Sequence, residues 1–226
     1  MTSHDANLPA LIDHTMLRPD ATKQDVLRLC QEAMQFGFLV VFVPPCYVEE
    51  AVKAVADSGI RVGIPIGFPL GGHMTKSKVA EALEAVACGA KILDMVINIS
   101  RLKSGDHDYV RQDIAEVVRS TSNVEHKVIL ETCYLTSQEK RTACRLVVEA
   151  GAEYVKTSTG FAVGGATVED VRLLKQAVAG NAKVKASGGI RDWKTTLEML
   201  RAGADRIGTS ASLKILEEWS ATRRRG

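Results

Sequence analysis

Eight short apolar runs alternate with longer amphipathic stretches along this chain of 226 residues. The runs lie at 10–14, 38–43, 61–66, 90–97, 126–131, 153–157, 183–187 and 205–209. Most of them are rich in Val and Ile and almost continuously apolar, as strands are when both faces of a parallel sheet are buried. The pattern predicts an α/β fold in which each strand is followed by a helix.

The stretches between these runs carry helix signals. One of them has the spacing of a buried helix face, with apolar side chains at Val26, Leu29, Cys30, Ala33 and Met34. Three helix starts have the spacing of a capping box: Thr22 with Asp25, Thr136 with Glu139, and Thr167 with Asp170. Helix ends are predicted near glycines, which favour the left-handed cap: Gly37, Gly59, Gly89, Gly151 and Gly203.

Eight strand–helix units of roughly 25–30 residues predict a (β/α)8 TIM barrel. The alternative is a doubly wound sheet, but the first strand is not followed by a dinucleotide-binding glycine fingerprint. Neither a linker nor a shift in composition divides the chain, so we expect a single domain over 1–226.

The composition narrows the class of partner. Hydrophobic residues make up 46% and charged residues 25%, as in an ordinary globular protein. The formal net charge of +2 is too small for a dedicated nucleic-acid binder, and we interpret Arg223–Arg225 as a solvated tail. We expect neither a signal peptide nor a membrane span, because no apolar run approaches ~20 residues. Five cysteines without CxxC spacing favour a reducing, cytoplasmic location.

Two lysines interrupt strands that should be internal. Lys156 follows Tyr154-Val155, and Lys185 follows Val184 one strand later. Active sites of such barrels form at the carboxyl ends of the strands, and neighbouring strands would bring both amines into one interior. Each ammonium then disfavours the charge of the other, which lowers the pKa of at least one amine.

An amine with a lowered pKa can be a nucleophile. Free lysine titrates near ~10.4, whereas a neutral amine can add to a carbonyl and form a Schiff base. Asp94 interrupts Ile92-Leu93-Asp94-Met95 in the same way and could orient the lysines and relay protons. The spacing leaves a structural alternative open, in which the lysines only pair with carboxylates such as Asp94 and Asp13.

Glycines and hydroxyls follow the last two strands. Gly188 and Gly189 come after the seventh strand, and Gly208 and Ser210 lie at the end of the eighth. Barrels frequently bind phosphate with these two loops and a helix N-terminus. Tight turns would explain each glycine cluster equally well, but their joint position favours a phosphate site.

Other chemistry has little support in the sequence. The five histidines lack HxxxH or HxH spacing, so we predict neither a metal site nor a metal cofactor. No GxSxG elbow marks a nucleophilic serine. Cys46 follows Pro44-Pro45 in a predicted loop, where we expect a passive role.

Seven segments resemble the deoxyribose-phosphate aldolase family over nearly the whole chain. They are LIDHTMLRPDAT (11–22), IGFPLG (66–71), GAKILDMVINI (89–99), YVKTSTGF (154–161), GGATVEDV (164–171), VKASGGIRD (184–192) and RIGTS (206–210). The family cleaves 2-deoxy-D-ribose 5-phosphate reversibly into acetaldehyde and D-glyceraldehyde 3-phosphate. The resemblance therefore implies a class I aldolase that acts on a small sugar phosphate without a cofactor.

The resemblance also implies residue roles. Lys156 would form the Schiff base, Lys185 would depress its pKa, and Asp94 would relay protons. Asp13 and Thr15 would support them in the substrate pocket. The phosphate would be held at Gly160, Gly188, Gly189, Gly208 and Ser210. A homo-oligomer, dimer or tetramer, is expected.

The chain departs from the family pattern at three places. Phe42-Val43-Pro44-Pro45 replaces a Cys-Val-Asn-Pro-like run, which removes a polar pocket group. Ala211 replaces a second serine, and the end of the chain lacks a terminal tyrosine. Three rival functions remain open: a related class I aldolase, an isomerase that uses Asp94 as a base, and a barrel that only binds a sugar phosphate.

Overall fold

The structure of the protein is a computed structural model, described for residues 7–223. Eight parallel strands close into a barrel in the order in which they occur along the chain. Their bounds are β1 (Ile12–Thr15), β2 (Val40–Phe42), β3 (Arg61–Ile66), β4 (Ile92–Val96), β5 (Glu125–Ile129), β6 (Tyr154–Lys156), β7 (Lys183–Ser187) and β8 (Arg206–Thr209). The pairing of β1 with β8 completes the barrel and confirms the predicted (β/α)8 fold.

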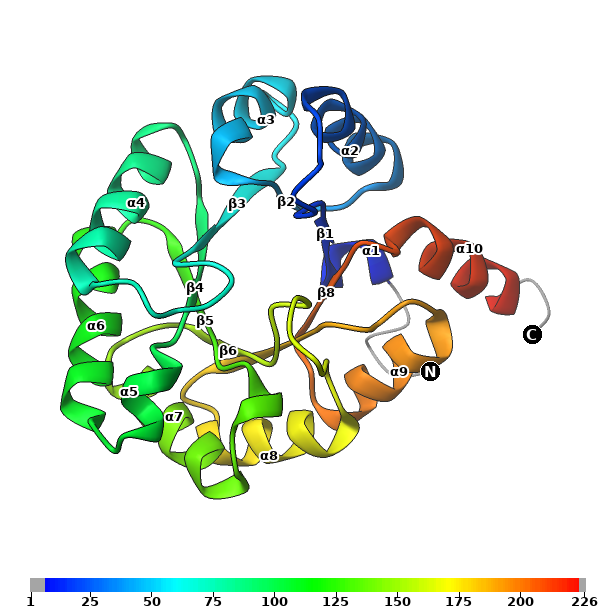
Figure 1. Ribbon diagram of the computed structural model, residues 1–226. Coiled ribbons are helices and arrows are strands. Elements are labelled where there is room, and N and C mark those ends of the chain that lie inside the picture. Colours follow the sequence, from blue (N-terminus) through cyan, green and yellow to red (C-terminus); the bar gives the residue numbers. More distant parts are fainter. Residues whose placement is uncertain (1–6, 224–226) are drawn as a thin grey trace.

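Helices form an outer ring around this barrel (Figure 1). Their bounds are α1 (Leu8–Leu11), α2 (Lys23–Phe36), α3 (Val48–Ala54), α4 (Thr75–Ala87), α5 (Ile99–Lys103), α6 (His107–Ser120), α7 (Ser137–Glu149), α8 (Val168–Val178), α9 (Trp193–Ala202) and α10 (Ser212–Arg223). Two short 3-10 helices, η2 (Pro45–Tyr47) and η3 (Thr132–Tyr134), follow β2 and β5. None of the helices between residues 7 and 223 is long and apolar enough to cross a membrane.

All eight predicted strands are present, with differences at their ends. Residues 10 and 11 belong to α1 instead of β1, because Pro9 stands in the first turn of a short helix there. Strand β5 ends at Ile129, and Glu131 adopts a left-handed conformation with φ 54°. The strands β3 and β7 have the predicted bounds.

The predicted capping boxes are complete at Thr22 and Thr136, where the reciprocal hydrogen bonds are present. The third is only half formed. Thr167 accepts a hydrogen bond from the backbone of Asp170, but the Asp170 carboxylate accepts one from Lys140 at 2.5 Å instead of turning back to the cap. A contact from another helix thus replaces the second half of the local motif.

Buried apolar side chains join the outside of the barrel to the helices. Strand residues such as Val128 and Val155 belong to the same cluster as helix residues such as Ile114 and Leu146. The predicted face of α2 is buried except at Met34, which is 45% exposed because it lies at the edge of the stripe. The Arg223 guanidinium lies 5.0 Å from the Trp219 ring, while the rest of the predicted basic tail lies outside the described residues.

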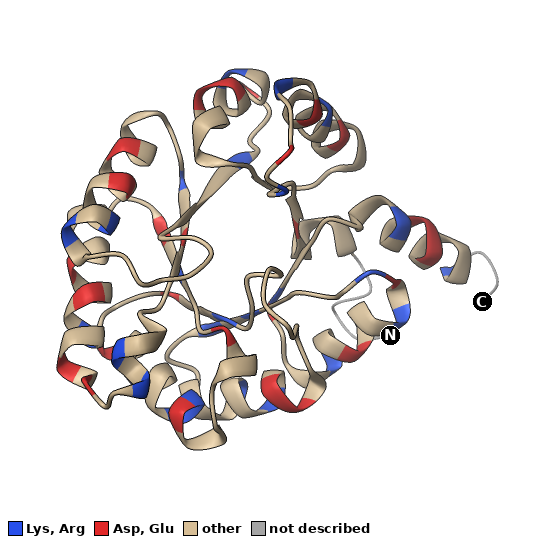
Figure 2. Ribbon diagram, viewed as in Figure 1, with Lys and Arg blue, Asp and Glu red and all other residues tan. Residues whose placement is uncertain are grey.

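The inside of the barrel is different, because much of it is charged. Figure 2 shows acidic and basic residues on the outer helices and also on the strands that surround the centre. A small apolar cluster of Val40, Phe42 and Ile92 is separate from the main core. Side chains alternate along a strand, so Val40 and Phe42 face the interior opposite Val41, which joins the outer cluster. The functional groups of the interior therefore sit on strands held rigid from outside.

Candidate active site

Strand register brings the predicted lysines together. Lys156 and Lys185 are Cα partners in the pairing of β6 with β7. Asp94 is the Cα partner of Lys127 on β5, and Asp13 on β1 is the partner of Gly208 on β8. Because these positions lie at a similar height in the closed barrel, their side chains converge in one buried layer.

The carboxylate of Asp94 joins the two lysines. The Nζ atoms of Lys156 and Lys185 lie 2.8 Å and 2.7 Å from the same atom, Oδ2 of Asp94. Both amines and the carboxylate are buried. The structure thus brings the three residues that the sequence singled out for chemistry into direct contact.

Asp13 binds the second lysine from below. Its Oδ2 lies 2.6 Å from Lys185 Nζ, and its Oδ1 accepts a hydrogen bond of 2.7 Å from Nε of Arg206. Asp13 is fully buried and does not line the cavity described below, so it supports Lys185 from beneath the expected pocket wall. Lys185 therefore has two carboxylate partners, whereas Lys156 has one.

Sequence reasoning missed two buried cations of this layer, Lys127 and Arg206. Lys127 pairs with Glu125 and lies 3.9 Å from Oδ1 of Asp94. Arg206 is the first residue of β8 and Lys127 follows Glu125 and His126 on β5, and such polar neighbours are typical of a solvent-exposed segment. The period of two along β5 gives the missing signal, because it places Lys127 on the same face as Ile129, the partner of Lys156.

The two central lysines are both buried, but their pKa values shift in opposite directions. The pKa of Lys156 is lowered to about 8: burial is the largest cause, Asp94 opposes the shift, and the charge of Lys185 acts in the same direction as burial. Burial also disfavours the charge of Lys185, but Asp13 and Asp94 raise its pKa above the ordinary value. The expected effect of Lys185 on Lys156 is therefore present, although desolvation is the larger cause.

Asp94 keeps its charge in spite of its surroundings. Burial alone would raise its pKa, but the ammonium groups of Lys156, Lys185 and Lys127 lower it below the usual range. Within residues 7–223 no group donates a hydrogen bond to its Oδ1. Asp94 is thus an ionised hydrogen-bond acceptor. Its Oδ2 accepts from both lysines, and its Oδ1 accepts from no group of the described residues.

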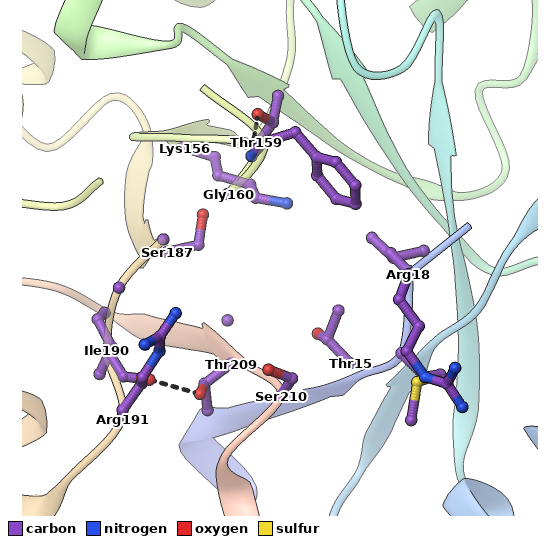
Figure 3. Close-up of a pocket in the computed structure, with 16 residues that line it drawn as sticks. Thr15, Arg18, Lys156, Thr159, Gly160, Ser187, Ile190, Arg191, Thr209 and Ser210 are labelled. Carbon is purple, nitrogen blue, oxygen red and sulfur yellow. Dashed lines mark hydrogen bonds between the residues drawn. The ribbon is translucent and has the colours of Figure 1, made fainter. Parts of the chain in front are cut away.

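A cavity of about 340 Å³ opens above these charges at the carboxyl ends of the strands. Figure 3 shows the Lys156 side chain reaching into it, with Thr15, Ser187 and Ser210 around the same space. Its walls include every predicted pocket residue except Asp13: Thr15, Gly160, Gly188, Gly189, Gly208 and Ser210. The volume suits a small-molecule ligand.

The glycines on one side of this cavity leave the backbone accessible. Gly160, Gly188 and Gly189 have φ of 86°, 90° and 79°, a region that glycine adopts without strain. A Cβ on Gly188 would lie 3.0 Å from Cβ of Ser158, so the loops after β6 and β7 also need its small size. Exposed backbone amides of this kind suit an anion such as phosphate.

Comparison with known proteins agrees with this arrangement. The model of the DeoC/LacD family aldolases matches residues 9–218. The chain belongs to this aldolase family. It is 54% identical to the deoxyribose-phosphate aldolase of Thermoanaerobacter sp. (strain X514) over 217 residues, which is 95% of this chain and 97% of that protein.

Solved aldolase structures have the same fold. The aldolase designated QR15 superposes with a TM-score of 0.93 at 42% identity and covers 97% of this chain and 99% of its own. The deoxyribose phosphate aldolase from Aeropyrum pernix, described as a tetramer, gives a TM-score of 0.89 at 33% identity over 95% and 92% of the two chains. Similarity thus extends over the whole barrel.

The loop of this aldolase that carries Gly160 is held by a residue without a predicted role, Glu131. Its two carboxylate oxygens accept hydrogen bonds of 3.2 Å and 3.3 Å from the backbone N–H of Thr159, and the Thr159 hydroxyl donates a further one. Burial raises the pKa of Glu131. Glu131, with its left-handed backbone and buried carboxylate, thus fixes the loop that follows Lys156.

The described residues at which the chain departs from the family pattern do not themselves line the cavity of this aldolase. Pro44, Pro45 and Cys46 do not line it, and the Cys46 side chain is exposed. Ala211 donates its backbone N–H to the Thr209 hydroxyl, which fixes the turn that carries Ser210. Between residues 7 and 223 no cluster of three or more His, Cys, Asp or Glu side chains is arranged to hold a metal ion.

Proposed function

We propose that this aldolase cleaves 2-deoxy-D-ribose 5-phosphate reversibly into acetaldehyde and D-glyceraldehyde 3-phosphate through a Schiff base on Lys156. The observation that carries the proposal is the position of Lys156. Its amine reaches a cavity lined by glycine loops and contacts the oxygen of Asp94 that also binds Lys185. Lys156 lines the cavity together with the glycine loops, and Asp94 and Lys185 lie behind the cavity wall in contact with one another, which supports a Schiff base on Lys156 with a buried relay behind it.

The reaction begins with the neutral amine of Lys156. With a pKa of about 8, about a tenth of this amine is unprotonated at pH 7. It adds to the C1 aldehyde of the open-chain sugar, and loss of water gives an iminium. The positive iminium is an electron sink next to C2, which prepares the C2–C3 bond for cleavage.

Cleavage requires proton transfers that Asp94 and Lys185 are placed to relay. The C3 hydroxyl loses its proton, the C2–C3 electron pair moves into the iminium to form an enamine, and D-glyceraldehyde 3-phosphate leaves. The enamine is then protonated at C2, and water hydrolyses the new iminium to release acetaldehyde and regenerate Lys156. Water lost in the first step is regained in the last, and the chemistry needs neither a metal nor an organic cofactor.

The phosphate of the substrate would lie against the glycine loops. Gly188 and Gly189 follow β7, and Gly208 and Ser210 close the same wall from β8. Backbone amides and the Ser210 hydroxyl would donate hydrogen bonds to the phosphate oxygens. Thr15 on β1, the strand that pairs with β8, would contact the sugar between the phosphate and Lys156.

A retro-aldol assay tests this function. The protein is incubated with 2-deoxy-D-ribose 5-phosphate in EDTA, and acetaldehyde and D-glyceraldehyde 3-phosphate are measured separately. We expect both products in equal amounts, and none from the Lys156→Ala variant. Cleavage of a ketose phosphate in preference to deoxyribose phosphate would favour the related class I aldolase, and undiminished turnover of Lys156→Ala would overturn the proposal.

We further propose a homo-oligomer, dimer or tetramer, in a reducing cytoplasm. The tetrameric relative supports the first point, together with exposed apolar side chains near the end of α2, where Phe36 is 41% and Leu39 is 47% exposed. The five free cysteines support the second. Light scattering coupled to size-exclusion chromatography would measure the mass, and a monomer at micromolar concentration would contradict the first point.

A further inference from the structure

One aromatic ring lies in the centre of the charged layer. Phe42 on β2 is 1% exposed and faces the barrel interior. Its ring centroid lies 3.8 Å from Nζ of Lys185, 5.6 Å from Nζ of Lys156 and 5.7 Å from Nζ of Lys127. One apolar side chain is therefore in contact range of three amines.

The neighbouring strand has a space that fits this ring. Gly63 on β3 is the Cα partner of Phe42, and a Cβ at Gly63 would lie 2.5, 2.6 and 2.7 Å from three of the ring carbons. Gly63 is not among the glycines with positive φ, so its backbone does not require glycine. The position needs glycine because the ring occupies the volume that a side chain would fill.

The contacts of Phe42 have two physical consequences. The face of an aromatic ring attracts a cation, most strongly at the short distance found for Lys185. The ring also fills the interior below Lys156, where a void lined by charged groups would admit water. Because desolvation is the largest cause of the lowered pKa of Lys156, water at this place would raise that pKa.

Phe42 acts from outside the substrate space. It is not among the residues that line the cavity, whereas Lys156 is. The charged groups that face Lys156 come from other elements: Asp13 on β1, Asp94 on β4, Lys127 on β5, Glu131 after β5, Lys185 on β7 and Arg206 on β8. Tyr154 is a second buried ring beside Lys127, at 4.9 Å, whereas the ring of Phe42 lies within about 6 Å of the amines of Lys156, Lys185 and Lys127.

We propose that Phe42, seated against Gly63, is a positioning residue that holds the amine of Lys185 and keeps water out of the interior below Lys156. The proposal rests on the proposed Schiff-base function and assigns a role to the place where the chain departs from the family's Cys-Val-Asn-Pro-like run. Phe42 carries out this role without touching the substrate. Gly63 is part of the arrangement, because a side chain at this position would overlap the ring of Phe42.

Two variants separate the two parts of the role. Phe42→Ala opens the interior to water, whereas Phe42→Leu keeps an apolar filling but removes the aromatic face. The matched control is Val41→Ala, which truncates a buried neighbour on the same strand that faces the helices. For each folded variant, the pH midpoint of borohydride-trapped imine on Lys156 is measured together with kcat and KM.

We expect Phe42→Ala to raise the imine midpoint by about one unit, which lowers the neutral amine at pH 7 about tenfold. Phe42→Leu should keep the midpoint of the wild type but lower kcat several-fold at every pH, with KM for the sugar phosphate unchanged. Val41→Ala should change neither. An unchanged midpoint in Phe42→Ala, or an equal shift in Val41→Ala, would overturn the proposal.

A second pair of variants covers the case in which Phe42→Ala does not fold. Gly63→Ala should displace the ring and lower kcat, and the loss should be smaller when Phe42→Leu is already present, because the two residues contact each other. Additive losses in the double variant would contradict the proposal. If the wild-type protein forms no imine, the proposed Schiff-base function is wrong. If the wild type forms the imine and the Phe42 and Gly63 variants behave like Val41→Ala, only the role proposed for Phe42 is wrong.

Discussion

Lys156 and Lys185 share a single carboxylate oxygen, Oδ2 of Asp94, at 2.8 Å and 2.7 Å. The arrangement is asymmetric, because Lys185 has a second partner in Asp13 and Lys156 does not. Two carboxylates raise the pKa of Lys185, whereas burial lowers the pKa of Lys156 to about 8 against the pull of one, so the two values move in opposite directions. The two lysines thus differ in the number of their carboxylate partners, whereas both are buried.

The pH dependence of the reaction follows from the pKa of about 8 for Lys156. The neutral amine reacts, so kcat/KM should rise about tenfold per pH unit below this value and level off above it. Initial rates between pH 5.5 and 9.5 at constant ionic strength measure the profile. A rate independent of pH between 6 and 8 would contradict the assignment.

Replacement of Lys185 by Met should impair catalysis through Lys156. Without Lys185, the carboxylate of Asp94 serves Lys156 alone and the repulsion disappears, so the pKa of Lys156 should rise. We expect at least about a tenfold loss of kcat/KM at pH 7, with partial recovery at pH 9. Lys183→Met, on the exposed start of the same strand, is the matched control and should retain activity. Equal losses at pH 7 and 9 would count against this explanation.

Asp94→Asn should separate imine formation from carbon–carbon cleavage. The amide cannot carry the relayed proton, so kcat should fall by about 10²–10⁴. The lysine loses its attractive carboxylate, so its pKa should fall further and borohydride trapping at pH 7 should persist. The buried cations lose a partner, which should lower the free energy of unfolding by about 3–5 kcal/mol in urea titrations. Loss of trapping in a folded variant would argue against this division of roles.

Ser210→Ala tests the phosphate site. The hydroxyl should donate to the phosphate, and loss of one hydrogen bond to a charged group should raise KM for the phosphorylated sugar about tenfold. The unphosphorylated sugar, 2-deoxy-D-ribose, should be cleaved as well by the variant as by the wild type. If both substrates lose equally, Ser210 does not bind the phosphate.

Much of the fold could be predicted because its signals are local. Continuous Val and Ile runs mark the strands, and Thr22 and Thr136 mark helix starts within four residues of chain. The half-formed cap at Thr167 could not be predicted, because Lys140 on another helix takes the Asp170 carboxylate. Residues 10 and 11, predicted as the start of the first strand, belong instead to α1, which has Pro9 in its first turn.

The site was predictable where a charged residue interrupts an apolar strand, as Lys156, Lys185 and Asp94 do. Lys127 and Arg206 were missed because they stand among polar neighbours at strand starts. The pairing of a lysine with Asp13 was an alternative left open by the sequence, and the structure has it for Lys185. The contact between Phe42 and Gly63 depends on the register of two separate strands. Sequence spacing carries no information on such contacts.

The most direct measurement is borohydride trapping followed by peptide mass spectrometry. The protein is reduced in the presence of 2-deoxy-D-ribose 5-phosphate or acetaldehyde, digested and mapped. We expect a five-carbon or two-carbon adduct on Lys156, at a yield that rises with pH through about 8. An adduct on Lys185 or Lys127 with Lys156 unmodified, or turnover without any trapped adduct, would contradict the assignment of Lys156 as the Schiff-base lysine.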